Sequence, residues 1–428
     1  MKRFKQKNEK IKKLLLVVCA FLFLVGCSDD DSFPVEEREA TTELRQLVEG
    51  NPTLKSLLIK AIEKGIQINP DKKTNPVQTL EQYYEFVDWT QHAMPWNVVS
   101  FAEDGDIFKR IDQSLNYFFF INDIPLEELD GKGLYNNSLQ YYEPYRSWLK
   151  EVAKSWGQYL DSESSWNDDY LRIVAQEDTF GINKGWYEDA SNWKTFNQFF
   201  ARKLRNKEQR PIASIQDASV LTSPADACYQ GKWNIDEEGY IEQHEGVQIK
   251  AKKYASIAEL MGGGAYQSLF KGGTLIHSFL NVYDYHRYHF PMSGKVLDKR
   301  IIDGDYAVGG NITWDESLRE YVLDCDIPGW QSIETRGCVV LDTDAFGIVA
   351  LLPIGMMPVT SINWTDNVQV GATVNKGDEL GYFLFGGSDF VILFQEHVEL
   401  TPLVEAYSHQ LMGECIGKLS VRKHTDKK

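Results

Sequence analysis

The sequence predicts an α+β protein in which a helical N-terminal domain, residues 41–190, precedes a β-rich core domain, residues 191–428. Two observations predict this order. Before residue 210, apolar residues recur with the period of amphipathic helices. After residue 215, short apolar runs are separated by Gly, Asp and Asn, which is typical of strands joined by turns. With 43% hydrophobic residues, the chain can bury sizeable cores in both parts.

The first 26 residues have the form of a bacterial lipoprotein signal peptide. Seven basic residues lie between Lys2 and Lys13, and an apolar run follows from Leu14 to Val25. This run is shorter than the roughly 20 residues that span a bilayer. It ends in Leu-Val-Gly-Cys, which resembles a lipobox, so we expect Cys27 to become the lipidated first residue of the mature chain. The alternative is an uncleaved membrane anchor.

Residues 27–40 are expected to form an acidic tether. The segment Ser28-Asp29-Asp30-Asp31-Ser32 also resembles the export tag that sends some bacterial lipoproteins to the cell surface. We therefore expect a lipid-anchored protein of the bacterial cell envelope, in the outer membrane or displayed at the surface.

The charge of the mature chain excludes some partners. Removing residues 1–26 leaves 38 basic and 61 acidic residues, a formal net charge of −23. Such a chain is not expected to bind nucleic acid or to hold anionic lipid through a basic patch. Membrane attachment would depend on the acyl chains of Cys27.

The remaining cysteines are candidates for disulfides in an exported chain. Three pairings are open among Cys228, Cys325, Cys338 and Cys415, and the sequence does not choose between them. No cysteine cluster has the spacing of a metal site, so no metal is predicted.

Helices are expected in order along the first domain. Asn51-Pro52 gives an N-cap and a first turn, an apolar stripe follows from Leu54 to Ile62, and Gly65 is a stop signal. Further helices are predicted at residues 77–93, 139–161 and 193–204. Aromatic residues in these stretches are expected in the core; they include Tyr83, Tyr84, Phe86 and Trp89.

Strands are predicted in the second domain at residues 273–279, 294–302, 337–342, 347–352 and 390–394. Residues 290–296 and 371–378 also look like the halves of a biotinyl or lipoyl carrier. A carrier needs a Met-Lys-Met-like hairpin with an exposed lysine, and none stands between these segments. We interpret the likeness as shared architecture, which argues little for function.

Candidate chemistry centres on Gly386-Gly387-Ser388, which stands immediately before an apolar strand. A serine that attacks the carbonyl of the preceding residue needs a tight, strained turn, which glycines permit. It also needs a base, and neutral histidine is the usual acceptor near neutral pH. We predict His289 as this base, with Asp226 holding its tautomer and stabilising the imidazolium.

This chemistry would cut the chain between Gly387 and Ser388. An acyl shift produces an ester, elimination leaves dehydroalanine at residue 388, and loss of ammonia gives a pyruvoyl group. The two chains, ending at Gly387 and running from 388 to 428, would stay associated. A pyruvoyl carbonyl forms a Schiff base with a substrate amine and withdraws electrons from the bond to the departing carboxylate, as pyridoxal phosphate does elsewhere.

The surrounding motifs resemble those of the phosphatidylserine decarboxylase family, over residues 192 to 394. In the family's order, the chain carries residues 196–204 (FNQFFARKL), 223–226 (SPAD), 272–274 (GGT), 284–289 (DYHRYH), 290–296 (FPMSGKV), Gly355 and 386–388 (GGS). Each motif alone would be weak, but their order is specific. The resemblance implies a pyruvoyl-dependent decarboxylase domain over residues 191–428.

The resemblance also implies a role for His286. Its position is similar to the family position that contacts the reacting carboxylate and can reprotonate the carbon, a step that suits a general acid of near-neutral pKa. Two alternatives stay open. Asp226 could cap a turn after Pro224, and His286 with His289 could form a metal pair, although no third ligand stands at a useful spacing.

Two residues depart from the family pattern. Ala227 replaces a usual glycine, and Asp389 stands where a small hydroxyl residue is typical. Neither change removes a reacting group. Asp389 places a negative charge beside the expected pyruvoyl group, where it could slow processing or favour a cationic amine.

Three functions follow as hypotheses. The helical domain, with Asn75-Pro76-Val77 as its local cue, resembles the extension of soluble relatives such as fungal tryptophan decarboxylases. We therefore place a free L-amino acid, with an aromatic one as the leading choice, slightly ahead of phosphatidylserine as the substrate. The third hypothesis is an uncleaved, non-catalytic surface-binding lipoprotein.

Overall fold

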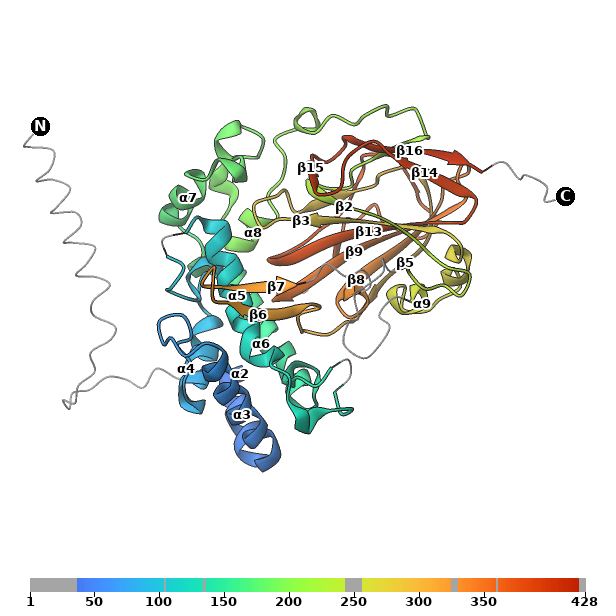
Figure 1. Cartoon of the computed structure of the whole chain (residues 1–428). Coiled ribbons are helices and arrows are strands. Elements are labelled where there is room, and N and C mark those ends of the chain that lie inside the picture. The colour runs from blue at the N-terminus through green and yellow to red at the C-terminus, as the bar shows by residue number, and fades with distance from the viewer. Residues whose placement is uncertain are drawn as a thin grey trace, which may run out of the picture. The chain divides into compact units, whose positions relative to one another are not determined.

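The computed structural model describes residues 37–103, 105–133, 136–242, 256–324, 330–358 and 361–422. The predicted signal peptide, Cys27, Cys325 and most of the tether lie outside the described residues. From Arg38 onward the chain forms one compact unit, with most of the helices on one side of a β-rich core (Figure 1). None of the helices in the described ranges combines the length and apolarity that a membrane span requires.

Eight α-helices are described. They are α2 (Glu39–Gly50), α3 (Pro52–Ile68), α4 (Leu80–Thr90), α5 (Ile107–Asp123), α6 (Tyr145–Leu160), α7 (Asp168–Ala175), α8 (Phe196–Phe200) and α9 (Ile257–Leu260). The expected helices at residues 77–93, 139–161 and 193–204 correspond to α4, α6 and the shorter α8. No helix was predicted over α5, whose residues Asn116–Asp123 are all buried although Asn116, Asn122 and Asp123 are polar.

Helix α3 confirms its start signal and corrects its stop signal. The Asn51 side chain accepts a hydrogen bond from the amide of Leu54 at 3.1 Å, as an N-cap does. Gly65, however, lies inside the helix and not after it. A Cβ atom there would meet Ile124 at 3.3 Å and Phe120 at 3.4 Å, so this glycine allows α3 and α5 to approach closely.

The expected aromatic core is largely present. Tyr83 and Tyr84 are each 1% exposed, and the hydroxyl of Tyr83 donates to the side-chain oxygen of Asn122 at 2.7 Å. Phe86 packs against the same core. The prediction is wrong for Trp89, which is 45% exposed and lies edge-on to His92.

Eight antiparallel strands form the main sheet, in the order β11-β5-β8-β9-β13-β3-β2-β15. Their bounds are β2 (Ala227–Asn234), β3 (Thr274–Leu280), β5 (Gly294–Ile302), β8 (Thr335–Asp342), β9 (Ile348–Pro358), β11 (Thr373–Val374), β13 (Gly386–Phe394) and β15 (Ser408–Gln410). The five predicted strands are therefore confirmed, as β3, β5, β8, β9 and β13.

Three smaller sheets complete the fold, in the orders β1-β16-β14, β10-β12-β4 and β6-β7. Their strands are β1 (Val220–Thr222), β4 (Arg287–His289), β6 (Asn311–Asp315), β7 (Glu320–Asp324), β10 (Asn363–Trp364), β12 (Glu379–Tyr382), β14 (Val398–Pro402) and β16 (Cys415–Val421). Helix α5 packs against the β6-β7 pair, which joins the helical part to the core.

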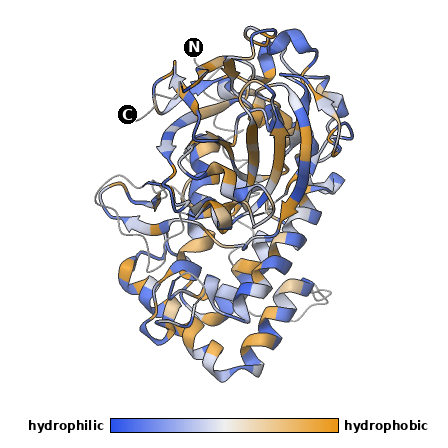
Figure 2. Ribbon diagram, turned by 90° about the vertical axis from the view of Figure 1, so that its right-hand side faces the viewer, coloured by the Kyte–Doolittle hydropathy of each residue, from blue (hydrophilic) through white to orange (hydrophobic). Residues whose placement is uncertain are grey.

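Strand β13 is central and is buried on both faces. Phe390 and Ile392 face one apolar cluster, whereas Val391 and Leu393 face another. Figure 2 shows the apolar residues gathered along these central strands. The strand begins with the Gly-Gly-Ser sequence, so its N-terminal end determines where Ser388 lies.

Candidate active site

Ser388 lies at the beginning of β13, between Gly355 of β9 and Leu280 of β3. The pairing with β9 shifts between Gly386 and Ser388, and Gly386 has a φ of 153°, which favours glycine. Ser388 is completely buried, and its Oγ atom has no hydrogen-bond partner among the described residues. The expected hydrogen bond from Ser388 to His289 is therefore not formed in this structure.

The segment that leads into this turn is fixed from two sides. The amide of Phe383 donates to the carbonyl of His286 at 2.9 Å. The amide of Phe385 donates to the side chain of Asn197, in α8, at 3.0 Å. The ring of Phe385 also lies edge-on to that of Phe200, 5.4 Å between centroids. Helix α8, which carries the FNQFFARKL motif, thus holds the residues before the Gly-Gly pair.

His286 lies in the loop that connects β3 to β4. The ring is completely buried and stacks on Phe200, with centroids 3.7 Å apart. Its Nδ1 atom donates to the carbonyl of Asp284 at 2.9 Å, which leaves Nε2 as an acceptor without a partner among the described residues. Burial, reinforced by the charge of Arg202, holds the pKa of His286 well below its usual range.

These surroundings correct the expected role of His286 as an acid of near-neutral pKa. A ring with a strongly lowered pKa is neutral at physiological pH and carries no spare proton. It can accept a hydrogen bond at Nε2, and it can return a proton only after taking one up. The correction arises because the sequence motif does not show that Phe200 covers the ring.

Buried hydrogen bonds hold the loop around His286 in place. The guanidinium of Arg202 donates to the carbonyl of Tyr283 at 2.6 Å and to that of Asp284 at 3.0 Å. The carboxylate of Asp284 accepts from the amide of Asn281 at 2.8 Å and pairs with His409 at 2.7 Å. The loop starts one residue after Leu280, which is the strand partner of Ser388. These hydrogen bonds hold it in place up to β4.

His289 is buried and is hydrogen-bonded through both ring nitrogens. Its Nδ1 atom donates to the carbonyl of Gly377 at 3.0 Å, and its Nε2 atom accepts from the hydroxyl of Tyr285 at 3.1 Å. Burial lowers the pKa of His289, although the Gly377 carbonyl and the charges of Glu379 and Asp226 oppose this effect. A neutral ring with this tautomer is suited to act as a base through Nε2.

Asp226 does not hold the tautomer of His289, which corrects the expected triad. Its carboxylate accepts two hydrogen bonds from Arg210, at 2.8 and 2.5 Å, and one from the amide of Met412 at 2.8 Å. The carbonyl of Gly377 takes the position that was expected for Asp226. Arg210 is 1% exposed, and it was not identified because it stands outside the recognisable motifs.

Removing Arg210 should strongly destabilise the fold, because Asp226 would be left as a buried charge without its partner. For Arg210→Met we expect the free energy of unfolding to fall by about 3–5 kcal/mol, measured by urea denaturation. The exposed cation Lys203 supplies the control, and Lys203→Met should change this free energy by less than about 0.5 kcal/mol. Equal effects of the two changes would contradict the buried ion pair.

The two departures from the family pattern occupy different places. Ala227 begins β2, is buried, and pairs with Gln410 of β15. Asp389 is completely buried on the sheet face opposite to the Ser388 side chain, since side chains alternate along a strand. One of its carboxylate oxygens pairs with His277, and burial raises its pKa.

The expected disulfides are not formed among the described cysteines. Cys228, Cys338 and Cys415 are free. Each of the three predicted pairings of four cysteines requires one bond within this set of three, so none of these pairings is present in full.

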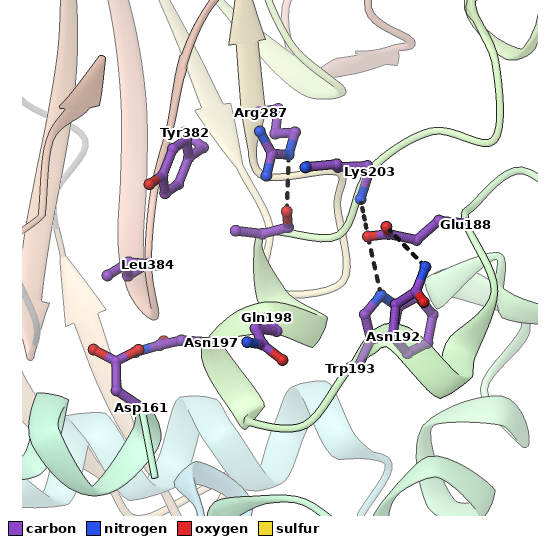
Figure 3. A pocket seen from close by; sticks show the side chains of 11 residues that line it. Asp161, Glu188, Asn192, Trp193, Asn197, Gln198, Lys203, Arg287, Tyr382 and Leu384 are labelled. Carbon is purple, nitrogen blue, oxygen red and sulfur yellow. Dashed lines mark hydrogen bonds between the residues drawn. The ribbon is translucent and has the colours of Figure 1, made fainter. Parts of the chain in front are cut away.

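A polar pocket of about 570 Å³ lies beside residues 382–385 (Figure 3). Tyr382 and Leu384 line it, whereas the alternate residues Phe383 and Phe385 are buried on the other side of the segment. In Figure 3, Glu188 accepts hydrogen bonds from the Lys203 amide at 2.9 Å and from the Trp193 ring at 3.3 Å. Because Tyr382 and Leu384 face the pocket and Phe383 and Phe385 face the other side, the segment that precedes the Gly-Gly pair separates this pocket from His286.

Comparisons with known proteins identify relatives of this chain. The family model for phosphatidylserine decarboxylase matches residues 196–418. The chain is 34% identical to phosphatidylserine decarboxylase proenzyme 3 of Schizosaccharomyces pombe, over 55% of this chain and 23% of the relative. It is 35% identical to the proenzyme of Ruminiclostridium cellulolyticum, over 48% of this chain and 61% of the relative.

A third relative is covered over most of its length. The chain is 32% identical to the phosphatidylserine decarboxylase proenzyme of Clostridium novyi, over 63% of this chain and 85% of the relative. The first two matches span less than two thirds of those relatives. Members of this family form a pyruvoyl group from a serine on self-cleavage. The sequence resemblance is thus confirmed, and the chain belongs to the phosphatidylserine decarboxylase family.

Proposed function

We propose that this chain is a proenzyme that cuts itself between Gly387 and Ser388, and that the processed protein decarboxylates phosphatidylserine to phosphatidylethanolamine. The observation that carries the proposal is the position of Ser388. It is a buried serine after a bulged Gly-Gly turn, on a strand whose neighbour β3 leads directly into the histidine-bearing loop. The family supports the same chemistry.

For self-cleavage we propose that His289 removes the proton of Ser388, as the sequence predicts. Tyr285 now occupies Nε2 of His289, so the hydroxyl of Tyr285 must give way before the ring can reach Ser388. Catalytic hydrogen bonds are often incomplete before the reacting state is formed, which makes such a shift reasonable. The charge of Asp226 would stabilise the protonated ring through space.

The surroundings of residue 388 fit a pyruvoyl group. Ser388 Oγ and His286 Nε2 are both buried and both without partners among the described residues. When present, the group withdraws electrons from the bond to the departing carboxylate. The neutral ring of His286 would bind and orient the substrate through Nε2, and its stacking on Phe200 would keep water from that side.

The substrate proposal differs from the first hypothesis drawn from the sequence. The relatives reported above are named phosphatidylserine decarboxylase proenzymes, which favours the aminophospholipid over a free amino acid. A free L-amino acid stays the second candidate for one reason. Helices α2 to α7 lie outside the residues that the family model matches, so part of the protein differs from the common core.

Carbon dioxide release separates these substrates. We expect the purified, processed protein to release it from carboxyl-labelled phosphatidylserine in detergent micelles, and to release at least about tenfold less from free tryptophan or serine. Release from a free amino acid alone would overturn the lipid proposal. An uncut chain that is folded and inactive on both would support a non-catalytic binding protein instead.

We also propose that Cys27 carries the lipid anchor in the bacterial envelope, on the strength of the lipobox-like sequence before it. Cells fed an alkyne-bearing fatty acid should label the wild-type chain and leave Cys27→Ser unlabelled. The variant should also leave the membrane fraction, because it lacks the acyl chains that would anchor the wild-type chain stably. Cys415→Ser is the matched control and should be labelled like the wild-type chain. If Cys415→Ser and Cys27→Ser were labelled equally, the assignment would be contradicted.

A further inference from the structure

An apolar cavity of about 130 Å³ lies between helix α5 and the sheet. Ile111 and Leu115 line it from α5, and Phe279 and Met356 line it from β3 and β9. The α5 wall stands outside the residues that the family model matches. The cavity is therefore built partly by the helical segment that accompanies the common core in this chain.

The cavity adjoins the cleavage site along the sheet. Phe279 is paired with Asp389, the residue after Ser388. Met356 directly follows Gly355, which is paired with Ser388 itself. Phe279 therefore lies on the same sheet face as Asp389, which is opposite to the Ser388 side chain, so the cavity approaches residue 388 from the other face of the sheet.

A buried carboxyl group without partners faces this cavity. Glu334 lines it and is 1% exposed, and neither of its carboxyl oxygens has a hydrogen-bond partner among the described residues. The second oxygen of Asp389 also has none. Asp112 lines the cavity too, but its oxygens accept hydrogen bonds from Gln113 at 2.8 Å and Asn116 at 3.2 Å.

The charged groups around Glu334 determine its protonation. Burial raises the pKa of Glu334 well above its usual range, and the charges of Asp305 and Asp389 act in the same direction. Only Arg336 opposes them. Without a ligand, these surroundings therefore favour the protonated form of Glu334.

The chemistry of the wall selects the ligand. The wall is apolar except for two acids and one amide, and it holds no Lys or Arg among the described residues. A ligand that suits it has an apolar body and one end that donates hydrogen bonds. Buried polar atoms that lack partners are unfavourable, so a donor that reaches Glu334 would recover part of this free energy.

We propose that this cavity binds the apolar group of a primary amine and that Glu334 receives the amine. The inference goes beyond the proposed function, because the cavity lies on the sheet face opposite to the Ser388 side chain. Glu334 and an ammonium ion each bring one ionisable proton, and the bound pair holds only one of them. Binding therefore releases one proton to solvent, whether the pair is carboxylate with ammonium or carboxylic acid with amine.

Equilibrium binding to the uncleaved Ser388→Ala protein tests this proposal without turnover. We expect isothermal titration calorimetry with phenethylamine to show one site at pH 7. The measured heat should vary with the ionisation enthalpy of the buffer, as release of one proton requires. Phenethyl alcohol and hydrocinnamate have the same apolar body, and they should bind at least about tenfold more weakly.

Three variants in the Ser388→Ala background locate the site. Glu334→Gln should weaken phenethylamine binding at least about tenfold and abolish proton release. Glu316→Gln changes an exposed carboxylate outside the cavity, and it should change the affinity less than about threefold. Leu115→Trp adds a larger side chain to the α5 wall of the cavity, and it should also weaken binding.

A competition experiment distinguishes a lipid amine from a free amine. Displacement of phenethylamine by monomeric dihexanoyl phosphatidylethanolamine would assign the cavity to the lipid, and failure of displacement would assign it to free amines. Equal binding of amine and alcohol, or unchanged binding in folded Glu334→Gln, would overturn the proposal, as would no binding at all. These results do not depend on whether the wild-type chain cleaves itself or decarboxylates a lipid.

Discussion

Replacing Ser388 with alanine is expected to leave one uncut chain and to abolish decarboxylation. The wild-type protein should give two chains under denaturing conditions, one ending at Gly387 and one beginning at residue 388 with a blocked amino terminus. The variant lacks the hydroxyl that attacks the Gly387 carbonyl, so neither the cut nor the pyruvoyl group can form. Intact mass spectrometry measures both outcomes directly.

Two controls sharpen this experiment. Ser278 is a buried serine on β3, away from the Gly-Gly turn, so Ser278→Ala should still be cut. Ser388→Cys keeps a nucleophile at the same position and should recover part of the cleavage. Far-ultraviolet circular dichroism should show that all three variants fold. Cutting of Ser388→Ala at the same bond would remove Ser388 from the reaction and refute the proposed cofactor.

The sequence could predict the parts of this fold that have a local signal. The strands β3, β5, β8, β9 and β13 follow from short apolar runs between turn residues, and the N-cap of α3 follows from Asn51. Helix α5 was not predicted; its residues Asn116–Asp123 are all buried, polar ones included, because the helix packs against β6 and β7, which the sequence does not show. Gly65 was predicted as a helix stop, but it lies inside α3 and allows close packing between two helices. The sequence does not show this contact.

The candidate site shows the same limit. Ser388 and His286 could be identified because each stands in a motif with known chemistry. The partner of Asp226 could not, since Arg210 is close to it only in the folded chain. The sequence also does not show which side chains are buried. Phe200 covers the ring of His286, and this burial lowers the pKa of His286. Glu334 stands in no recognisable motif. Long-range packing determines these properties.

The two histidines should separate the two reactions. For His286→Asn we expect normal cleavage and a loss of decarboxylation by about 10²- to 10⁴-fold, because His286 is proposed to act on the substrate after the pyruvoyl group has formed. For His289→Asn we expect uncut chain, because this ring is the proposed base for cleavage. Intact mass and carbon dioxide release, measured on the same preparations, distinguish these outcomes.

The pH dependence of cleavage tests the assignment of His289 further. Burial lowers the pKa of this ring, and only the neutral form can accept a proton from Ser388. The cleavage rate should therefore fall only when the pH drops through the lowered value. At about pH 6.5, where an ordinary histidine is half protonated, more than half of the plateau rate should remain. A midpoint at or above this pH, or cleavage by folded His289→Asn at the wild-type rate, would transfer the role of base to another residue. His286 would then be the next candidate, because its Nε2 atom is buried without a partner among the described residues and its pKa is lowered further.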